Sequence, residues 1–155
     1  MKNSLQVIGA TDIVDLPELG WFKVPVRIDS GAATSAIHCS RVRLIKDGEK
    51  TSLHFDLDTK KGAPQHSYVV TEFKETTIRN SSGIDEKRYV IKTRITLFGK
   101  KIRTEFSLAN RGKMSYPILL GRKLLKNRFI VDVSQKNLSH AKRSSGAIRS
   151  KVKGK

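Results

Sequence analysis

The sequence is poor in the residues that define several common protein classes. It has one cysteine, Cys39, so no disulfide can form within the chain. Aromatic residues make up 6% of the chain, too few for the stacking surfaces of typical single-strand nucleic-acid binders. No apolar run approaches the roughly 20 residues that span a bilayer. The N-terminus has no long apolar core and contains Asp12, unlike a secretory signal, so we expect a cytoplasmic protein with no membrane association.

Acidic residues are also scarce relative to basic ones. The 155 residues include 31 Lys and Arg but only 14 Asp and Glu, which gives a formal net charge of +17. Such an excess attracts polyanions but says little about the fold. Nucleic acid, ribosomal surfaces and acidic peptides are therefore the candidate partners. The length suits one compact domain.

The hydrophobic pattern is mostly that of β-strands. In 89–97, apolar residues and Thr alternate with Lys92 and Arg94, and 102–108 alternates in the same way around Arg103 and Glu105. With a turn at Gly99 between them, these runs predict a hairpin. Many short strands predict an all-β domain, closed or sandwiched. Other expected elements are strands at 6–14, 22–28, 35–45, 52–57, 68–78 and 128–133, and one short helix at 122–127.

The composition changes after Asp132. Seven Lys and Arg follow, with Ser and Gly among them and no acidic residue. Such a segment buries little apolar surface. We therefore expect a folded domain at 1–135 and a basic, disordered tail at 136–155, which either aids solubility or binds RNA without sequence preference.

A carboxylate follows directly on an apolar strand in RIDSGAATSAIH, residues 27–38. Ser30 brings a hydroxyl, and Gly31 lets the chain turn sharply just after Asp29. Ala32 and Ala33 leave the turn uncovered. A rigid turn of this kind could hold Asp29 against a ligand. The alternative is an ordinary turn in which Asp29 accepts local backbone N–H groups.

A second motif helps to decide whether Asp29 belongs to a ligand site or to an ordinary turn. In YPILLGRKLL, residues 116–125, an apolar strand ends at Gly121 and a helix begins with Arg122. An early Asp-Ser-Gly-Ala turn and a late apolar-apolar-Gly-Arg together resemble the subunit of retropepsin-like aspartic proteases. The segments LPELG (16–20), RIDSGAATSAIH (27–38), KDGE (46–49), EKRYVIKTRITLFG (86–99) and FSLANRGKMSYPILLGRKLL (106–125) also follow one another as in a single family.

That family is known as ATP-dependent zinc proteases, also called RimB-like or RimK-associated, and the resemblance covers roughly residues 6–134. It implies a closed, retropepsin-like acid-protease barrel with one short helix toward the C-terminal side, and a catalytic aspartate at Asp29. Gly121 and Arg122 would support the turn. We favour Arg122 paired with a buried carboxylate, because Arg suits bidentate carboxylate geometry; the alternatives are that it caps the last carbonyls of its helix or faces solvent. Ser30 stands where threonine is commoner in the family, and Ala32-Ala33 where a basic residue is often found.

The chemistry of this class needs two carboxylates that share one proton. The chain has a single Asp-Ser-Gly, so we expect a homodimer with Asp29 from each subunit. Ser30 would brace the paired turns, and Gly31 and Ala32 would let the substrate approach. By the same resemblance a hairpin flap would cover the substrate. Residues 58–70, with Gly62, Ala63 and Pro64 near the tip, are the candidate, and an ordinary mobile loop is the alternative.

The words zinc and ATP in the family name have no matching motif. The chain lacks H-E-x-x-H and the G-x-x-x-x-G-K-[ST] phosphate loop. His38, Cys39 and His54 could be drawn as a zinc site, but strand geometry does not favour it. We therefore expect no metal and no cofactor, and assign any use of ATP to a partner enzyme.

The resemblance links the family to RimK, a ligase that adds glutamates to a ribosomal protein. The implied substrate of a +17 peptidase is then a Glu-rich ribosomal-protein tail, with the ribosome or the ligase as associated partners. Lys60, Lys61 and Lys74 near the flap would favour such a substrate. Glu86 and Arg88 are expected to form a salt bridge near the base of the flap. Two other classes stay open: a non-catalytic peptide- or ribosome-binding module, and an RNA-binding basic β-domain.

Overall fold

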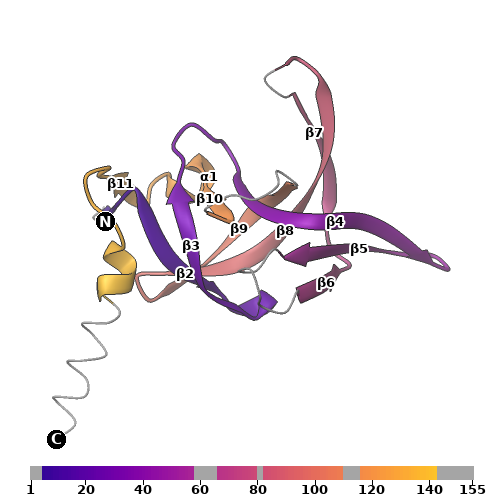
Figure 1. Ribbon diagram of the computed structural model, residues 1–155, viewed down its shortest axis with the longest axis horizontal. Helices are drawn as coiled ribbons and strands as arrows, with labels where there is room; N and C mark the ends of the chain where they lie inside the picture. Colours follow the sequence, from indigo (N-terminus) through magenta and orange to yellow (C-terminus); the bar gives the residue numbers. More distant parts are fainter. Residues whose placement is uncertain (1–4, 58–65, 80–81, 110–115, 143–155) are drawn as a thin grey trace, which may run out of the picture.

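A computed structural model describes residues 5–57, 66–79, 82–109 and 116–142. Its centre is a closed β-barrel (Figure 1). The ring closes because the short strand β10 pairs in parallel with β3 and antiparallel with β4. Around the ring the strands are β10 (Ile118–Leu120), β3 (Trp21–Ile28), β2 (Thr11–Leu16), β8 (Asp85–Leu97), β9 (Lys100–Ala109) and β4 (Ser35–Asp47).

Two long strands continue beyond the barrel. After an irregularity between Ser40 and Arg43, β4 pairs with β5 (Lys50–Leu57), which in turn pairs with β6 (His66–Val70). The first half of β8 pairs with β7 (Lys74–Arg79), and its second half with β9. In Figure 1 the β7–β8 ribbon rises from the barrel, while the β4–β5 hairpin extends to one side.

The alternation expected for 89–97 and 102–108 is present. Ile91, Ile95 and Leu97 are buried, whereas Lys92 and Arg94 are exposed. The predicted hairpin is β8–β9, with Ile95 opposite Ile102. Burying one large aliphatic or aromatic side chain contributes about 1.5–3 kcal/mol, so this inward face stabilises the barrel. The expected all-β fold is confirmed, and α1 (Arg122–Leu125) is the short helix near its expected position.

Two predicted strands are each divided in the structure. The run 6–14 contains β1 (Gln6–Ile8), which pairs with β11 (Phe129–Val131), and then β2 in the barrel. Gly9 lies between them, where a Cβ would come within 2.8 Å of Lys136 N, so the chain passes residues 135 and 136 too closely for a side chain. The run 68–78 is likewise split into β6 and β7.

The beginning of the segment predicted as a tail is packed against the barrel. Residues 138–142 are helical. The buried Asp12 carboxylate accepts hydrogen bonds from the backbone N–H groups of Ser139 (2.9 Å) and His140 (3.1 Å). The Ser139 hydroxyl accepts one from the Phe98 N–H at 2.8 Å. Residues 143–155 lie outside the described residues, so disorder there stays a prediction.

The remaining element is η1, a short 3-10 helix at Pro17–Leu19 that ends at Gly20 in a left-handed conformation. Across the part of the chain that the structure describes, no helix has the length and apolar character needed to cross a membrane.

Candidate functional site

The Asp29 turn lies where two parallel strands end side by side. Leu120 of β10 pairs with Ile28 of β3. The Asp29 N–H then donates to the Leu120 carbonyl oxygen at 2.8 Å. Asp29 is half-buried at this position. The Asp29 carboxylate therefore lies directly after the end of β3, where the backbone is hydrogen-bonded to the end of β10.

The start of α1 holds the other side of the turn. The Arg122 N–H donates to the Ala32 carbonyl at 2.8 Å, and the Lys123 N–H to the Ala33 carbonyl at 3.0 Å. These bonds use N–H groups at the beginning of a helix, which have no partner within the helix. The structure thus joins the two sequence motifs that the resemblance placed in one site.

Gly121 permits this close approach. A Cβ at this position would lie 2.8 Å from the Ala32 carbonyl oxygen and 2.9 Å from the Thr34 carbonyl carbon. Its N–H donates to the Ser35 hydroxyl oxygen at 3.0 Å, across 86 residues of sequence. Sequence reasoning missed Ser35 as a support. The available signal was a hydroxyl residue shortly after the Asp-Ser-Gly turn.

The Asp29 carboxylate is partly engaged within its own turn. Its Oδ1 accepts the Gly31 N–H at 3.0 Å. Gly31 does not have a left-handed φ, so its backbone conformation does not require a glycine. A Cβ at Gly31 would instead make a tight contact of 3.3 Å with the same Oδ1. Within the described part of the chain, Oδ2 accepts no hydrogen bond. One oxygen is thus oriented by the turn, and the other remains for water or a ligand.

Arg122 supports the turn differently from the ion pair that was favoured. Its Nη1 donates to the Ser30 carbonyl oxygen at 3.1 Å, and the side chain is exposed. Among the described residues it pairs with no carboxylate, so the expectation of a buried ion pair was wrong. The reason is that the turn presents a backbone carbonyl to the guanidinium. Ser30 itself is exposed.

The other buried carboxylates are engaged elsewhere. Asp15 accepts the Lys23 N–H at 2.9 Å. Asp56 accepts the Ser67 hydroxyl at 2.6 Å and lies 3.6 Å from Arg41. Residues 29–34 contain no carboxylate besides Asp29. The Asp29 turn of one chain therefore presents a single carboxylate.

Three of the predicted substrate-binding residues, Gly62, Ala63 and Pro64, lie outside the described residues. Within the described part, β7–β8 is one of the two ribbons that extend beyond the barrel. It rises from the same side as the turn between β3 and β4 (Figure 1). The expected ion pair is present in this ribbon, with Arg88 Nη2 at 3.3 Å from Glu86 Oε2.

The three residues that could be drawn as a zinc site lie on two neighbouring strands. His38 and Cys39 are buried in β4, and His54 in β5 has its Nε2 at 3.2 Å from the Ser52 hydroxyl oxygen. In the ranges that the structure describes, no three His, Cys, Asp or Glu side chains gather closely enough to hold a metal ion.

A charged cluster that sequence reasoning missed joins three elements. Lys74 Nζ of β7 lies 2.6 Å from Glu105 Oε2 of β9, and Lys123 Nζ of α1 lies 3.6 Å from Glu105 Oε1. The hydrogen bond from Lys74 is the main cause that lowers the pKa of Glu105, against the opposing effect of burial. Lys74 was assigned to the substrate, but its partner in the structure is Glu105.

Comparison with known proteins identifies relatives with ligase names. The chain is 34% identical over 140 residues to a "Probable alpha-L-glutamate ligase" from Shewanella pealeana, which matches 87% of this chain and 30% of that protein. A protein of the same name from Parasynechococcus marenigrum is 32% identical over 130 residues, or 81% of this chain and 28% of that protein. The chain thus spans less than a third of the length of these relatives.

A solved structure shares the fold. The crystal structure of a Legionella pneumophila protein of unknown function superimposes with a TM-score of 0.70 at 23% identity, covering 88% of this chain and 99% of that one. The model of the RimB-like family, described as retropepsin-like aspartic endopeptidase RimB, matches residues 7–142. This match includes the Asp29 turn, Gly121 and Arg122, and the chain belongs to the RimB-like family of retropepsin-like proteins.

Proposed function

We propose that this protein is an aspartic-type peptidase in which Asp29 residues from two copies of the chain form the catalytic pair. The observation that carries the proposal is the clamped turn. Asp29 is held by the Leu120 carbonyl, the neighbouring turn is bonded to the start of α1, and one carboxylate oxygen is left for a ligand. A pre-oriented carboxylate of this kind suits general acid–base chemistry.

The second carboxylate has to come from a second copy, because the turn of one chain carries one. Two carboxylates about 3 Å apart cannot both ionise, so the pair retains one proton. The ionised partner takes a proton from water, and the water oxygen bonds to the peptide carbonyl carbon. The protonated partner donates to the carbonyl oxygen. Cleavage of the C–N bond then returns the carbonyl, and a proton passes to the leaving amine.

The substrate that fits the charge of the chain is acidic. The net charge of +17 favours association with Glu-rich segments. The relatives named as glutamate ligases contain a segment similar to this chain within a longer polypeptide. This supports a functional association with a ligase, and the glutamate chain such an enzyme makes is the substrate class that we propose.

The β7–β8 ribbon is a second candidate for the part that covers the substrate, beside 58–70. It rises on the same side as the Asp29 turn (Figure 1), and its strands are linked by Arg79–Asp85 (3.1 Å) and Lys87–Glu75 (3.7 Å). A two-stranded ribbon with one end in the barrel can bend as a unit about its base.

The deciding experiment compares wild type with Asp29→Asn on a mixture of Glu-rich peptides, in EDTA, from acidic to neutral pH. We expect wild type to cut and Asp29→Asn to lose at least about 100-fold in rate, because the base is removed. Asp47→Asn, in the exposed β4–β5 turn, is the matched control and should behave as wild type. Cutting that requires zinc would contradict the proposal, and binding without cutting by any variant would favour a peptide-binding module.

A further inference from the structure

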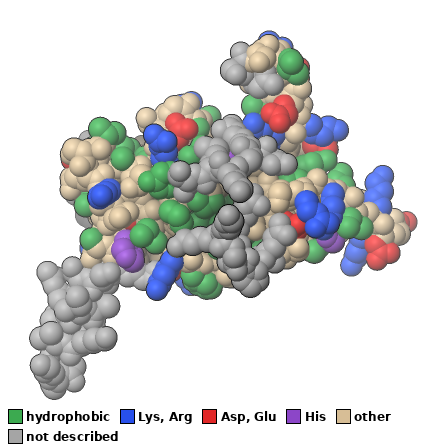
Figure 2. Space-filling model, viewed as in Figure 1, with side chains coloured by type: hydrophobic (Ala, Val, Ile, Leu, Met, Phe, Trp, Pro, Cys, Tyr) green, Lys and Arg blue, Asp and Glu red, His purple; other side chains and the backbone are tan. Residues whose placement is uncertain are grey.

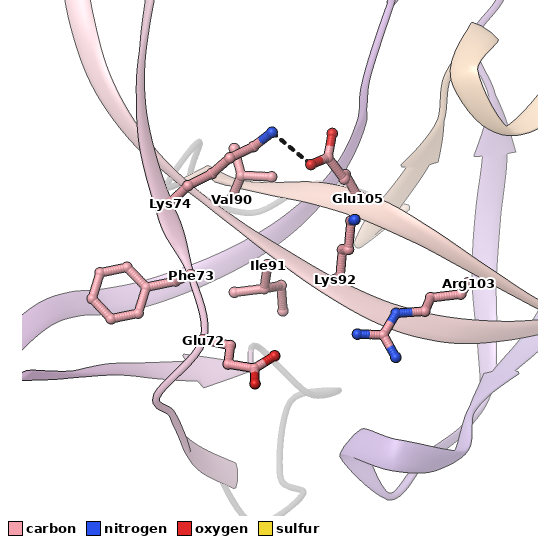
Figure 3. Close-up of a pocket in the computed structure, with 8 residues that line it drawn as sticks. All are labelled: Glu72, Phe73, Lys74, Val90, Ile91, Lys92, Arg103 and Glu105. Carbon is pink, nitrogen blue, oxygen red and sulfur yellow. Dashed lines mark ion pairs between the residues drawn. The ribbon is translucent and has the colours of Figure 1, made fainter.

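A groove lies at the base of the β7–β8 ribbon, on residues that the Asp29 turn does not use. Two adjoining hollows of about 240 and about 320 Å³ share Glu72, Ile91, Lys92 and Arg103. The two hollows are adjacent, because they share these residues, and together they are called the groove. In Figure 3, Phe73 and Glu72 lie on one side, Lys92 and Arg103 on the other, and Ile91 between them.

Basic side chains without an ion-pair partner among the described residues lie at this groove, two of them in its lining. Arg94 of β8 is directly opposite Arg103 of β9, and Lys92 is two residues from Arg94 on the same face. All three side chains are exposed, and none forms an ion pair with a described residue. Like charges directly opposite on neighbouring strands are destabilising. We call Lys92, Arg94 and Arg103 the cationic rim.

Three carboxylates, those of Glu18, Glu72 and Glu105, also line the groove, but none of them forms an ion pair with the cationic rim. Glu105, opposite Lys92, is paired with Lys74 and Lys123. Glu18 Oε1 accepts hydrogen bonds from the Thr93 hydroxyl at 3.3 Å and the Arg94 backbone N–H at 2.9 Å, and Glu18 forms no ion pair with a described residue. Lys92, Arg94 and Arg103 therefore remain available to an anion from outside the described chain.

We propose that the groove and the cationic rim bind an acidic stretch of polypeptide, at a position separate from the Asp29 turn. This rests on the proposed function, because the bound stretch would belong to the same Glu-rich substrate. The groove favours a peptide over a nucleic acid because its lining is mixed. The half-buried Phe73 offers an apolar contact, which a peptide side chain can use and a phosphate backbone cannot.

Direct binding tests the proposal without cleavage. The probe is a fluorescently labelled Glu-rich peptide of about 12 residues, which spans about 40 Å when extended. Fluorescence anisotropy at low salt compares the Asp29→Asn protein with the same protein also carrying Lys92→Gln and Arg103→Gln. We expect these two changes to raise Kd about tenfold and to reduce its salt dependence, as the loss of two charge contacts predicts.

The matched control carries Lys46→Gln and Lys50→Gln, which remove the same charge from the β4–β5 hairpin. Basic side chains gather there as well (Figure 2). This control should leave Kd almost unchanged. Equal weakening by both pairs of substitutions would overturn the proposal, because net charge alone would then explain binding. Thermal melting checks folding, and the rim variant should melt no lower than its parent because like-charge repulsion is removed.

Two further readouts separate this proposal from the peptidase proposal. If wild type cuts Glu-rich peptides, the rim substitutions should raise KM and leave kcat unchanged, whereas a loss of kcat alone would contradict the proposal. If nothing is cut, the binding comparison still tests the proposed groove.

A single-stranded RNA of similar length is the competing ligand. Weakened RNA binding with unchanged peptide binding would assign the surface to nucleic acid and overturn the proposal.

Discussion

Asp29 owes its position to backbone groups that lie far from it in sequence. Its N–H is bonded to Leu120, and the turn that follows is bonded to Arg122 and Lys123. The side chains of this turn are small, and Arg122 adds a bond to the Ser30 carbonyl. At the scale of single residues, the geometry of the carboxylate therefore depends on how closely two backbone segments approach.

Gly121→Ala tests this dependence. A methyl group would lie 2.8 Å from the Ala32 carbonyl oxygen, so the turn or α1 has to shift. We expect a loss of about 1–3 kcal/mol in the free energy of unfolding, measured by urea denaturation. Gly48→Ala is the comparison, because it meets nothing within 4 Å and only its positive φ is strained. A smaller loss at Gly121 than at Gly48 would contradict the proposed close approach.

At the scale of elements, Glu105 connects three parts of the fold. Lys74 lies at the start of β7, Glu105 in β9 and Lys123 in α1, the helix that follows Gly121. A carboxylate between two lysines thus connects the base of the β7–β8 ribbon to the helix that holds the Asp29 turn.

The lowered pKa of Glu105 makes a pH-dependent prediction. A carboxyl group with a lowered pKa in the folded state stabilises the fold at pH values above its ordinary, unfolded pKa, and this contribution is lost as pH falls through the lower, folded value. Glu105→Gln should therefore be less stable than wild type at neutral pH, with the difference shrinking in acid. Urea denaturation at several pH values measures it. The exposed Glu49→Gln is the control, and a pH-independent difference would contradict the prediction.

At the scale of the whole molecule, the proposed activity needs two chains. Mixing wild type with Asp29→Asn at equal concentrations should reduce the activity per wild-type chain by about half if subunits exchange randomly, because half of the wild-type chains then face an inactive partner. Sedimentation across a concentration range would measure the dimer itself. Unchanged activity after long mixing, with exchange shown by labelled subunits, would mean that one chain suffices.

Much of the fold was predictable from local patterns. The two-residue alternation in β8 and β9 follows from one face being buried in the barrel, so the sequence alone predicts that hairpin. The division of 6–14 into β1 and β2 was not predictable, because it depends on residues 135 and 136 passing against Gly9. The packing of residues 138–142 was not predictable either. It depends on Asp12, which lies more than 120 positions earlier and accepts hydrogen bonds from two of their N–H groups.

The sequence by itself determined the all-β class, the family resemblance and Asp29 as the candidate residue, because these depend on local alternation and on short motifs. Only the tertiary structure decided that Arg122 bonds to the Ser30 carbonyl, that Glu105 is shared by Lys74 and Lys123, and that the cationic rim borders a groove. These features arise between strands and turns that are distant in sequence. The register and closure of the barrel determine which partner a charged side chain has, and no local sequence pattern predicts that partner.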